Sequence, residues 1–184
     1  FTHEFFYNDH IRRLLEAEHT SNDTWYFYPR TIVLCTFPWS LPVTASLILL
    51  PAKLLKQKNP FHIFIVCWIG VVFLIFQVAH SKLVSYIFPM FPALALLAGD
   101  FVYEALSDVK KKSILLLVLL LSSLVLLLIP LGLIIGWDKY SVYISSKIPI
   151  YITIAAFSIL AVSMLYSIFR SKLQRSVYLL ALVI

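Results

Sequence analysis

The chain has 184 residues, of which 61% are hydrophobic and only 13% are charged. A soluble domain averages about half apolar and about a quarter charged residues, so this composition excludes an ordinary water-soluble fold, a disordered chain and a disulfide-stabilised secreted domain. The net charge of +6 comes from basic residues in short segments between long apolar runs, and this distribution argues against a nucleic-acid-binding face. Because the chain begins at Phe1 and ends within an apolar run, we expect it to be a segment of a longer membrane protein.

Residues 1–30 predict an amphipathic juxtamembrane helix on the outer face of the membrane. Ile11, Leu14 and Leu15 form an apolar stripe at helical spacing, and charged side chains occupy the opposite face. Such a helix lies in the plane of the interface with its apolar side toward the lipid. The aromatic residues 25–28 then indicate the headgroup level, at which the first span is expected to begin.

Residues 31–184 predict a transmembrane bundle of about five spans and the start of a sixth. Five runs of 17 to 22 residues contain no Asp, Glu, Lys or Arg: Thr31–Leu50, Phe61–Val78, Leu83–Gly99, Ile114–Ile135 and Ile148–Phe169. A helix needs about 20 apolar residues to cross the hydrocarbon core, and only helices or closed barrels satisfy the backbone there. A shorter run, Val177–Ile184, is expected to begin a further span. The fold class is therefore an all-α, polytopic transmembrane helix bundle.

The prolines and cysteines within these runs lead to two further predictions. Pro38 and Pro42 should kink the first span, and prolines 89 and 92 the third, with neighbouring helices satisfying the freed carbonyls. Cys35 and Cys67 are expected to be small core residues, since no disulfide framework or zinc motif can be built from them.

The basic residues predict the orientation of the bundle. Nine of the fifteen Lys and Arg residues follow the first, third and fifth spans, in the short segments 53–58, 110–112 and 170–175. Short basic loops next to spans stay in the cytoplasm. We therefore place the N-terminal segment, the loop at residues 80–85 and the loop at residues 137–147 outside the cytoplasm.

The residues that could carry chemistry lie on this outer face. Glu4 and Asp9 could act in acid–base catalysis, although a solvated charge is the simpler interpretation, and His10 could contact an anion or be an ordinary interfacial histidine. Lys82 lies with His80 in a short polar gap between two apolar runs. Either its ammonium reaches the headgroup layer, or Lys82 and Tyr86 bind an anionic head group such as a lipid phosphate. The residues alone leave these two interpretations even.

Three ordered motifs resemble the bacterial polyprenyl-phosphate-sugar glycosyltransferases, the aminoarabinose transferases of lipid A and their relatives in the dolichyl-phosphate-mannose–protein mannosyltransferase superfamily. His80-Ser-Lys-Leu-Val-Ser-Tyr-Ile-Phe-Pro is similar to their Ser-Lys-Leu-Pro-Thr-Tyr-Ile-Leu-Pro segment. Phe5-Phe-Tyr-Asn-Asp-His-Ile-Arg-Arg is similar to their juxtamembrane stretch, and Trp25-Tyr-Phe-Tyr-Pro to the start of one of their spans. Val84 replaces a proline of the family and Asp9 a glutamate. The resemblance covers about residues 1–100.

The resemblance implies a C-type glycosyltransferase-like fold and an inverting sugar transfer at the outer face of the bacterial inner membrane. A carboxylate activates the acceptor hydroxyl, and the polyprenyl phosphate leaves while cations and tyrosines stabilise it. On this mapping Lys82, Tyr86, Arg13 and His10 bind the lipid phosphate. The catalytic acid is expected in an outer loop near the N-terminus of the whole enzyme, outside residues 1–184, so the chain alone should be inactive.

The implied partners are a polyprenyl-phosphate-linked sugar, a lipid or protein acceptor and membrane lipids, with no nucleic acid, metal or cofactor. A transporter, or a lipid-binding membrane module without chemistry, remains the alternative. Pseudo-repeated halves with broken helices would favour transport, and the sequence contains no convincing internal repeat.

Overall fold

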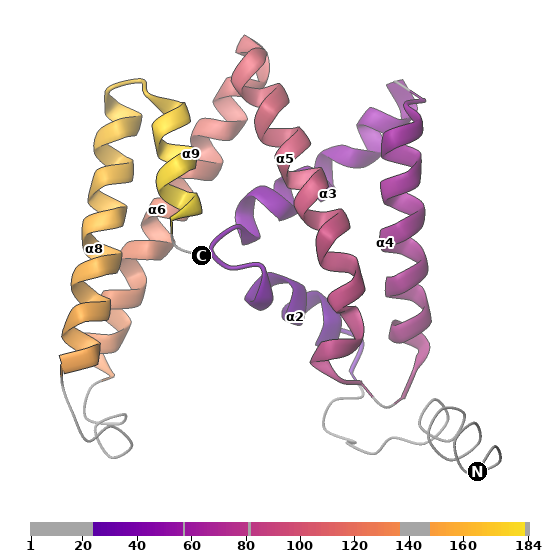
Figure 1. Ribbon diagram of the computed structural model, residues 1–184, viewed down its shortest axis with the longest axis horizontal. Coiled ribbons are helices and arrows are strands. Elements are labelled where there is room, and N and C mark those ends of the chain that lie inside the picture. Colours follow the sequence, from indigo (N-terminus) through magenta and orange to yellow (C-terminus); the bar gives the residue numbers. More distant parts are fainter. Residues whose placement is uncertain (1–23, 57, 81, 137–147, 183–184) are drawn as a thin grey trace. The chain divides into compact units, whose positions relative to one another are not determined.

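The computed structural model describes residues 24–56, 58–80, 82–136 and 148–182 (Figure 1). Every regular element in these ranges is helical: α2 (Phe27–Cys35), α3 (Ser40–Lys56), α4 (Pro60–Val78), η3 (Val84–Met90), α5 (Phe91–Ser107), α6 (Val109–Ile135), α8 (Ile148–Phe169) and α9 (Leu173–Ala181). The chain divides into two compact units, Phe1–Phe101 and Val102–Ile184. The amphipathic helix predicted within residues 1–30 falls mostly on residues 1–23, which lie outside the described ranges.

Four helical stretches of the described chain are long and apolar enough to cross a membrane: Pro60–Val78, Val84–Ser107, Lys111–Ile135 and Ile148–Phe169. Large apolar side chains are exposed along them, for example Leu74 at 63% and Ile159 at 65%. In water such surfaces would be an aggregation hazard, whereas in a bilayer they face lipid tails. These helices confirm the predicted all-α, polytopic membrane fold. Cys35 and Cys67 are among the exposed side chains, so the prediction that they belong to the core was wrong.

The first predicted span, Thr31–Leu50, is not one helix. α2 ends at Cys35 and α3 begins at Ser40, with Pro38 in the turn between them (Figure 1). Proline cannot donate a helical hydrogen bond. The carbonyls at the end of α2 are capped from within the turn instead: the Ser40 hydroxyl donates to Val33 at 2.6 Å. The structure therefore has a break where the sequence predicted a kink.

Two of the three basic residues expected in a loop after this run belong to a helix, whereas Lys58 lies in the connection. α3 continues through Pro51 to Lys56, and both Lys53 and Lys56 lie in its last turns. Asn59 then starts α4 as an N-cap, its side chain accepting the amide of Phe61 at 3.0 Å, with Pro60 in the first helical position. The connection between α3 and α4 is thus only three residues long.

The first unit packs around a stripe of small and aliphatic side chains on α5. Ala93, Leu94, Leu97 and Ala98 are buried at the spacing of one helix face, the two leucines at 1% exposure. They pack against apolar side chains of three other elements, which include Val43, Leu50, Ile65 and Met90. These side-chain contacts hold α5 against the other helices of the first unit, and van der Waals packing of this kind drives helix association in membranes.

The prolines of the third predicted span lie where a 3₁₀ helix gives way to an α-helix. η3 contains Pro89, and α5 begins at Phe91, directly before Pro92. The indole N–H of Trp68 in α4 donates to the carbonyl of Pro89 at 2.9 Å. A neighbouring helix therefore satisfies a carbonyl of the interrupted stretch, as the sequence predicted.

The second unit is built on the packed pair α6 and α8. α6 buries Leu115, Leu119, Ser122 and other residues of one face, and its serines bond back to their own helix. After α8 the chain reverses, and α9 packs against α8 with Leu173, Ser176 and Leu180 buried. Residues 177–181 of the last predicted run, Val177–Ile184, thus belong to a short amphipathic helix that begins earlier, at Leu173, and residues 183–184 lie outside the described ranges.

Candidate functional site

Lys82 lies in the extended segment that joins α4 to η3. α4 ends at Val78, and the backbone is extended at Ala79 and again at Leu83. The lysine is only 4% exposed, and it has an interaction partner in the protein. A lysine that merely reached the headgroup layer would keep its ammonium accessible. This burial favours a role for Lys82 inside the protein.

Tyr86 lies in the first turn of η3, and its ring is held by stacking. It packs on Phe76 of α4 with ring centroids 5.2 Å apart and planes inclined by 27°, and the side chain is half-buried. Because Lys82 precedes a 3₁₀ helix, the two residues are not neighbours on one α-helical face. Lys82 and Tyr86 therefore lie in one short segment, but the backbone between them is not the α-helix that the i,i+4 spacing suggested.

Tyr28 of α2 is a residue of this neighbourhood that the sequence did not single out. It is fully buried, and its hydroxyl lies near the backbone of Leu83 at a geometry that falls short of a hydrogen bond. Burial, and secondarily the nearby Tyr86, raise the pKa of Tyr28 to about 12. The hydroxyl therefore stays protonated at physiological pH and keeps a proton to donate.

A hydrogen bond links the start of α2 to the end of α4 in the same region. The Gln77 side-chain amide donates to the Trp25 carbonyl at 2.9 Å. The aromatic residues 25–28, predicted only as headgroup anchors, thus also place Tyr28 beside the Lys82 segment. His10 and Arg13, the other two predicted phosphate contacts, lie outside the described residues.

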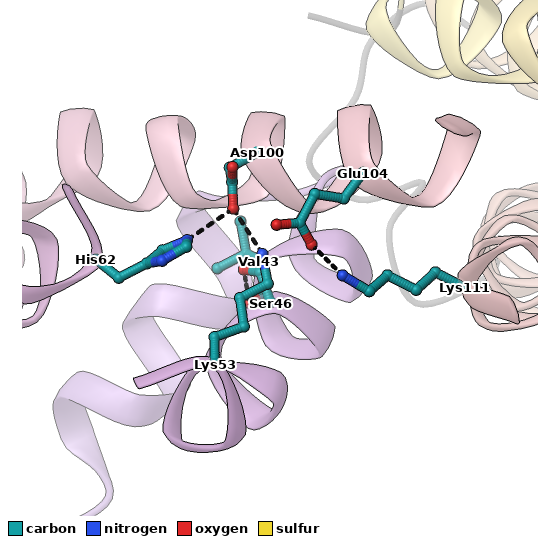
Figure 2. A network of polar contacts seen from close by, with 7 residues as sticks. All are labelled: Val43, Ser46, Lys53, His62, Asp100, Glu104 and Lys111. Atoms are coloured by element: carbon teal, nitrogen blue, oxygen red, sulfur yellow. Dashed lines mark hydrogen bonds and ion pairs between the residues drawn. The ribbon is translucent and has the colours of Figure 1, made fainter. Parts of the chain in front are cut away.

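A second polar group surrounds Asp100, toward the other end of α4 (Figure 2). One carboxylate oxygen, Oδ2, accepts from Lys53 Nζ at 2.6 Å and from His62 Nε2 at 3.0 Å. The His62 side chain is 3% exposed, and its Nδ1 is buried without a hydrogen-bond partner. These three side chains come from α3, α4 and α5, so the carboxylate ties three helices together.

The chemistry of this second group is that of a buried salt bridge. Asp100 and His62 are residue types that ligate metals, but Lys53 occupies the same carboxylate oxygen and supplies the compensating charge. One turn after Asp100, Glu104 pairs with Lys111 Nζ at 2.6 Å (Figure 2). We interpret these contacts as ionic links between helices.

The sequence reasoning overlooked Asp100 because the apolar runs were delimited by the absence of charge. Asp100 directly follows Gly99, the last residue of the third run, and was treated as the point at which that run ends. Lys53 was counted only as a topology signal. An acidic residue inside a helix that continues to Ser107 is the signal that could have identified it, since such residues in membrane spans are costly and need partners.

Comparison with known proteins supports the resemblance drawn from the motifs. The chain is 38% identical over 107 residues to the undecaprenyl phosphate-alpha-4-amino-4-deoxy-L-arabinose arabinosyl transferase of Pectobacterium atrosepticum, covering 54% of this chain and 18% of that protein. A second transferase of the same name from Proteus mirabilis is 34% identical over 119 residues, covering 61% of this chain and 20% of the relative. The transferase of an Enterobacter strain is 28% identical over 157 residues, 80% of this chain and 27% of its own length.

These matches confirm the predicted resemblance. The chain spans about a fifth of the length of the first two of these transferases. No family model matches the chain, and no solved structure does either. What the comparisons establish is homology to arabinosyl transferases named for an undecaprenyl phosphate donor, in a chain whose own fold is that of a multi-pass membrane protein.

Proposed function

We propose that this chain is part of an integral membrane glycosyltransferase that moves a sugar from a polyprenyl-phosphate carrier to an acceptor on the outer face of the bacterial inner membrane. The acceptor is a lipid resembling lipid A, or a protein. The observation that carries the proposal is the buried Lys82 in a motif that resembles the family's, in a chain homologous to undecaprenyl phosphate-aminoarabinose arabinosyl transferases. The names of those relatives support the donor class.

Lys82 and Tyr86 bind the phosphate of the carrier in this proposal, together with Arg13 and His10. A buried ammonium in a membrane protein is costly and gains most from a permanent anion. A phosphate offers several strong acceptor oxygens, to which both an ammonium and a phenolic hydroxyl can donate. Stacking on Phe76 holds the ring of Tyr86 in place.

The proposed reaction is the one that the resemblance to these transferases implies. A carboxylate outside residues 1–184 takes the proton of the acceptor hydroxyl, and the acceptor oxygen forms a bond to the anomeric carbon of the sugar. The bond between that carbon and the phosphate oxygen breaks, and the electron pair leaves with the phosphate. Lys82 stabilises the charge that develops on the departing group, a use of preorganised charge in a partly dry site.

The test is Lys82→Met in the full-length enzyme, with transfer measured at subsaturating donor. A hydrogen bond to a charged group is worth about 1.5–3 kcal/mol, so kcat/KM should fall roughly tenfold to a hundredfold. Lys82→Arg should recover part of the loss because it keeps the charge. Tyr86→Phe, which keeps the stacked ring, should show a smaller loss.

Lys58→Met serves as the control, since this exposed lysine lies at the opposite end of α4. Equal protein levels after membrane extraction would show that the variants insert normally. Wild-type turnover by both Lys82→Met and Tyr86→Phe would reject the phosphate assignment, and Arg13 would then be the next residue to substitute.

A further inference from the structure

A basic pocket of about 480 Å³ lies in the second unit, where α6 begins and α8 turns into α9. Lys112, Lys172 and Arg175 line it together with Gln174 and Tyr178, and none of its lining residues is acidic. Leu106 and Leu173 supply an apolar part of the wall. With Ser171, the pocket therefore presents three cations and three neutral donors beside an apolar surface.

The turn after α8 gives these cations a defined position. Ser171 has φ 56°, in the left-handed region, and its amide donates to Ile168 while the amide of Lys172 donates to Ser167. This pair of bonds is the Schellman arrangement that ends a helix and reverses the chain. α9 then packs on α8 through Leu173 and Ser176, which leaves Gln174 and Arg175 exposed on the opposite side.

The polar lining selects an anion with several acceptor oxygens. Arg175 can donate two parallel hydrogen bonds to a phosphate, and Lys112 and Lys172 act as point charges. Positive charge in a concave site also raises the local concentration of anions. A phosphate group therefore fits the pocket better than a carboxylate does, because it offers more acceptors to the same set of donors.

The position of the pocket along the helices indicates where that phosphate comes from. Lys112 lies at the start of a membrane-spanning helix, and residues 171–175 directly follow the end of another. This is the depth of the lipid headgroups. Tyr178, 71% exposed, is an amphipathic residue typical of that layer. Of the two leucines of the wall, the partly exposed Leu106 is the one that can contact the first part of an acyl chain.

We propose that this pocket binds the phosphate headgroup of an anionic phospholipid. The lipid belongs to the membrane leaflet in which α6 begins and α8 ends. The site is separate from the Lys82 segment and does not depend on the proposed transfer reaction. The basic residues that the sequence analysis used only as topology signals thus also form a binding site.

The experiment compares lipid binding to the full-length protein in detergent by native mass spectrometry. The ligands are phosphatidylglycerol and phosphatidylcholine with identical short acyl chains, and inorganic phosphate is the competitor. Phosphatidylglycerol should bind more tightly than phosphatidylcholine. Lys172→Gln/Arg175→Gln should weaken the binding of phosphatidylglycerol by about tenfold or more, whereas inorganic phosphate should compete poorly because it has no acyl chain.

Lys56→Gln/Lys58→Gln is the matched control, because it removes two exposed positive charges from another segment assigned to the same side of the membrane. Its effect should stay within about twofold, as for exposed charges in general. An equal loss in both double variants would mean non-specific attraction to a basic surface and would overturn the proposal. Equal binding of the two lipids would also overturn it, and so would displacement of phosphatidylglycerol by inorganic phosphate at similar concentration.

Discussion

Polar side chains are buried near both ends of α4. At one end Tyr28 lies with its hydroxyl buried near Leu83, and at the other His62 and Lys53 share the carboxylate of Asp100. A buried polar group without a hydrogen bond costs free energy, whereas a paired one is nearly neutral until its partner is removed. Substitutions at the two ends should therefore have opposite effects on stability.

Tyr28→Phe should leave the free energy of unfolding unchanged or raise it by up to about 1 kcal/mol, because it removes a buried hydroxyl that makes no hydrogen bond of good geometry. The difference in the free energy of unfolding between Tyr28→Phe and wild type should increase at alkaline pH. The pKa of Tyr28 is about 12 in the folded protein against 10.0 ordinarily, so above pH 10 the unfolded state ionises first and wild type loses stability up to about pH 12.

The measurement is unfolding in detergent as a function of pH, with Tyr26→Phe as the control because Tyr26 is 49% exposed. Tyr26→Phe should follow the wild-type pH dependence. If Tyr28→Phe were instead strongly destabilised at neutral pH, the Tyr28 hydroxyl would have to make a hydrogen bond that stabilises the fold.

A double-mutant cycle on Lys53→Met and Asp100→Asn should give a coupling free energy of about 1–2 kcal/mol. Each single variant leaves part of an ionic group buried without its partner, whereas the double variant removes both charges. The side chains are only 13% and 23% exposed, so solvent screens them little. Heat or denaturant unfolding of the four proteins in the same detergent provides the numbers.

The matched control is the same cycle on Lys111→Met and Glu104→Gln, an ion pair with the same 2.6 Å separation but with side chains 39% and 25% exposed. Its coupling free energy should be lower, about 0.5 kcal/mol, since the Lys111 side chain is more exposed than that of Lys53 and solvent screens it more. If the two cycles gave the same coupling free energy, the Asp100 pair would not be the stronger one, and the prediction would be wrong.

At the level of single elements, the turn between α8 and α9 rests on Ser171 in the left-handed conformation. A residue with a Cβ pays roughly 1–2 kcal/mol there, and glycine does not. Ser171→Gly should therefore raise the free energy of unfolding by about 1 kcal/mol, and Ser171→Val should lower it because its branched Cβ fits this region worst.

Ser113→Gly is the control for this prediction, because Ser113 is exposed within α6 in an ordinary helical conformation. Glycine should destabilise that position by about 0.5–1 kcal/mol. Unfolding of both variants is measured in one detergent. If glycine lowers the free energy of unfolding at position 113 and raises it at position 171, the backbone conformation and not the loss of the serine side chain determines the effect. A destabilised Ser171→Gly variant would contradict the interpretation.

The sequence could predict those elements whose formation depends on local properties, such as the length and hydrophobicity of a segment. The runs beginning at Phe61, Ile114 and Ile148 became helices with nearly the expected bounds, because length and hydrophobicity alone decide whether a segment can span a bilayer. The run Thr31–Leu50 has the same composition but is divided at Pro38, and hydropathy counts do not register the loss of one amide donor.

The residues of the candidate site also differ in whether the local sequence or long-range packing indicates their role. Lys82 and Tyr86 could be singled out because they stand together in a short polar gap. Tyr28 and the partners of Asp100 could not, since their roles depend on which helix faces pack together. No periodic pattern identifies that packing in helices that are apolar on every side.

At the level of the whole molecule, the arrangement of charges predicts which helix ends share one side of the membrane. Lys56 at the end of α3, Lys112 at the start of α6 and Lys172 after α8 all belong to short basic connections. The structure makes these connections shorter than the sequence suggested, with a single residue, Asp108, between α5 and α6. Basic residues this close to a span are the ones that determine orientation.

Single-cysteine labelling in intact cells tests this orientation, in a background in which Cys35 and Cys67 are replaced by serine. His80→Cys should react with a membrane-impermeant thiol reagent added outside, because His80 is exposed at the end of α4 assigned to the outer face. Lys56→Cys and Lys172→Cys should react only after the membrane is permeabilised, and this later labelling is the control for thiol reactivity. Labelling of position 56 but not of position 80 in intact cells would reverse the topology. Lys82 would then face the cytoplasm, where a transferase acting at the outer face could not use it.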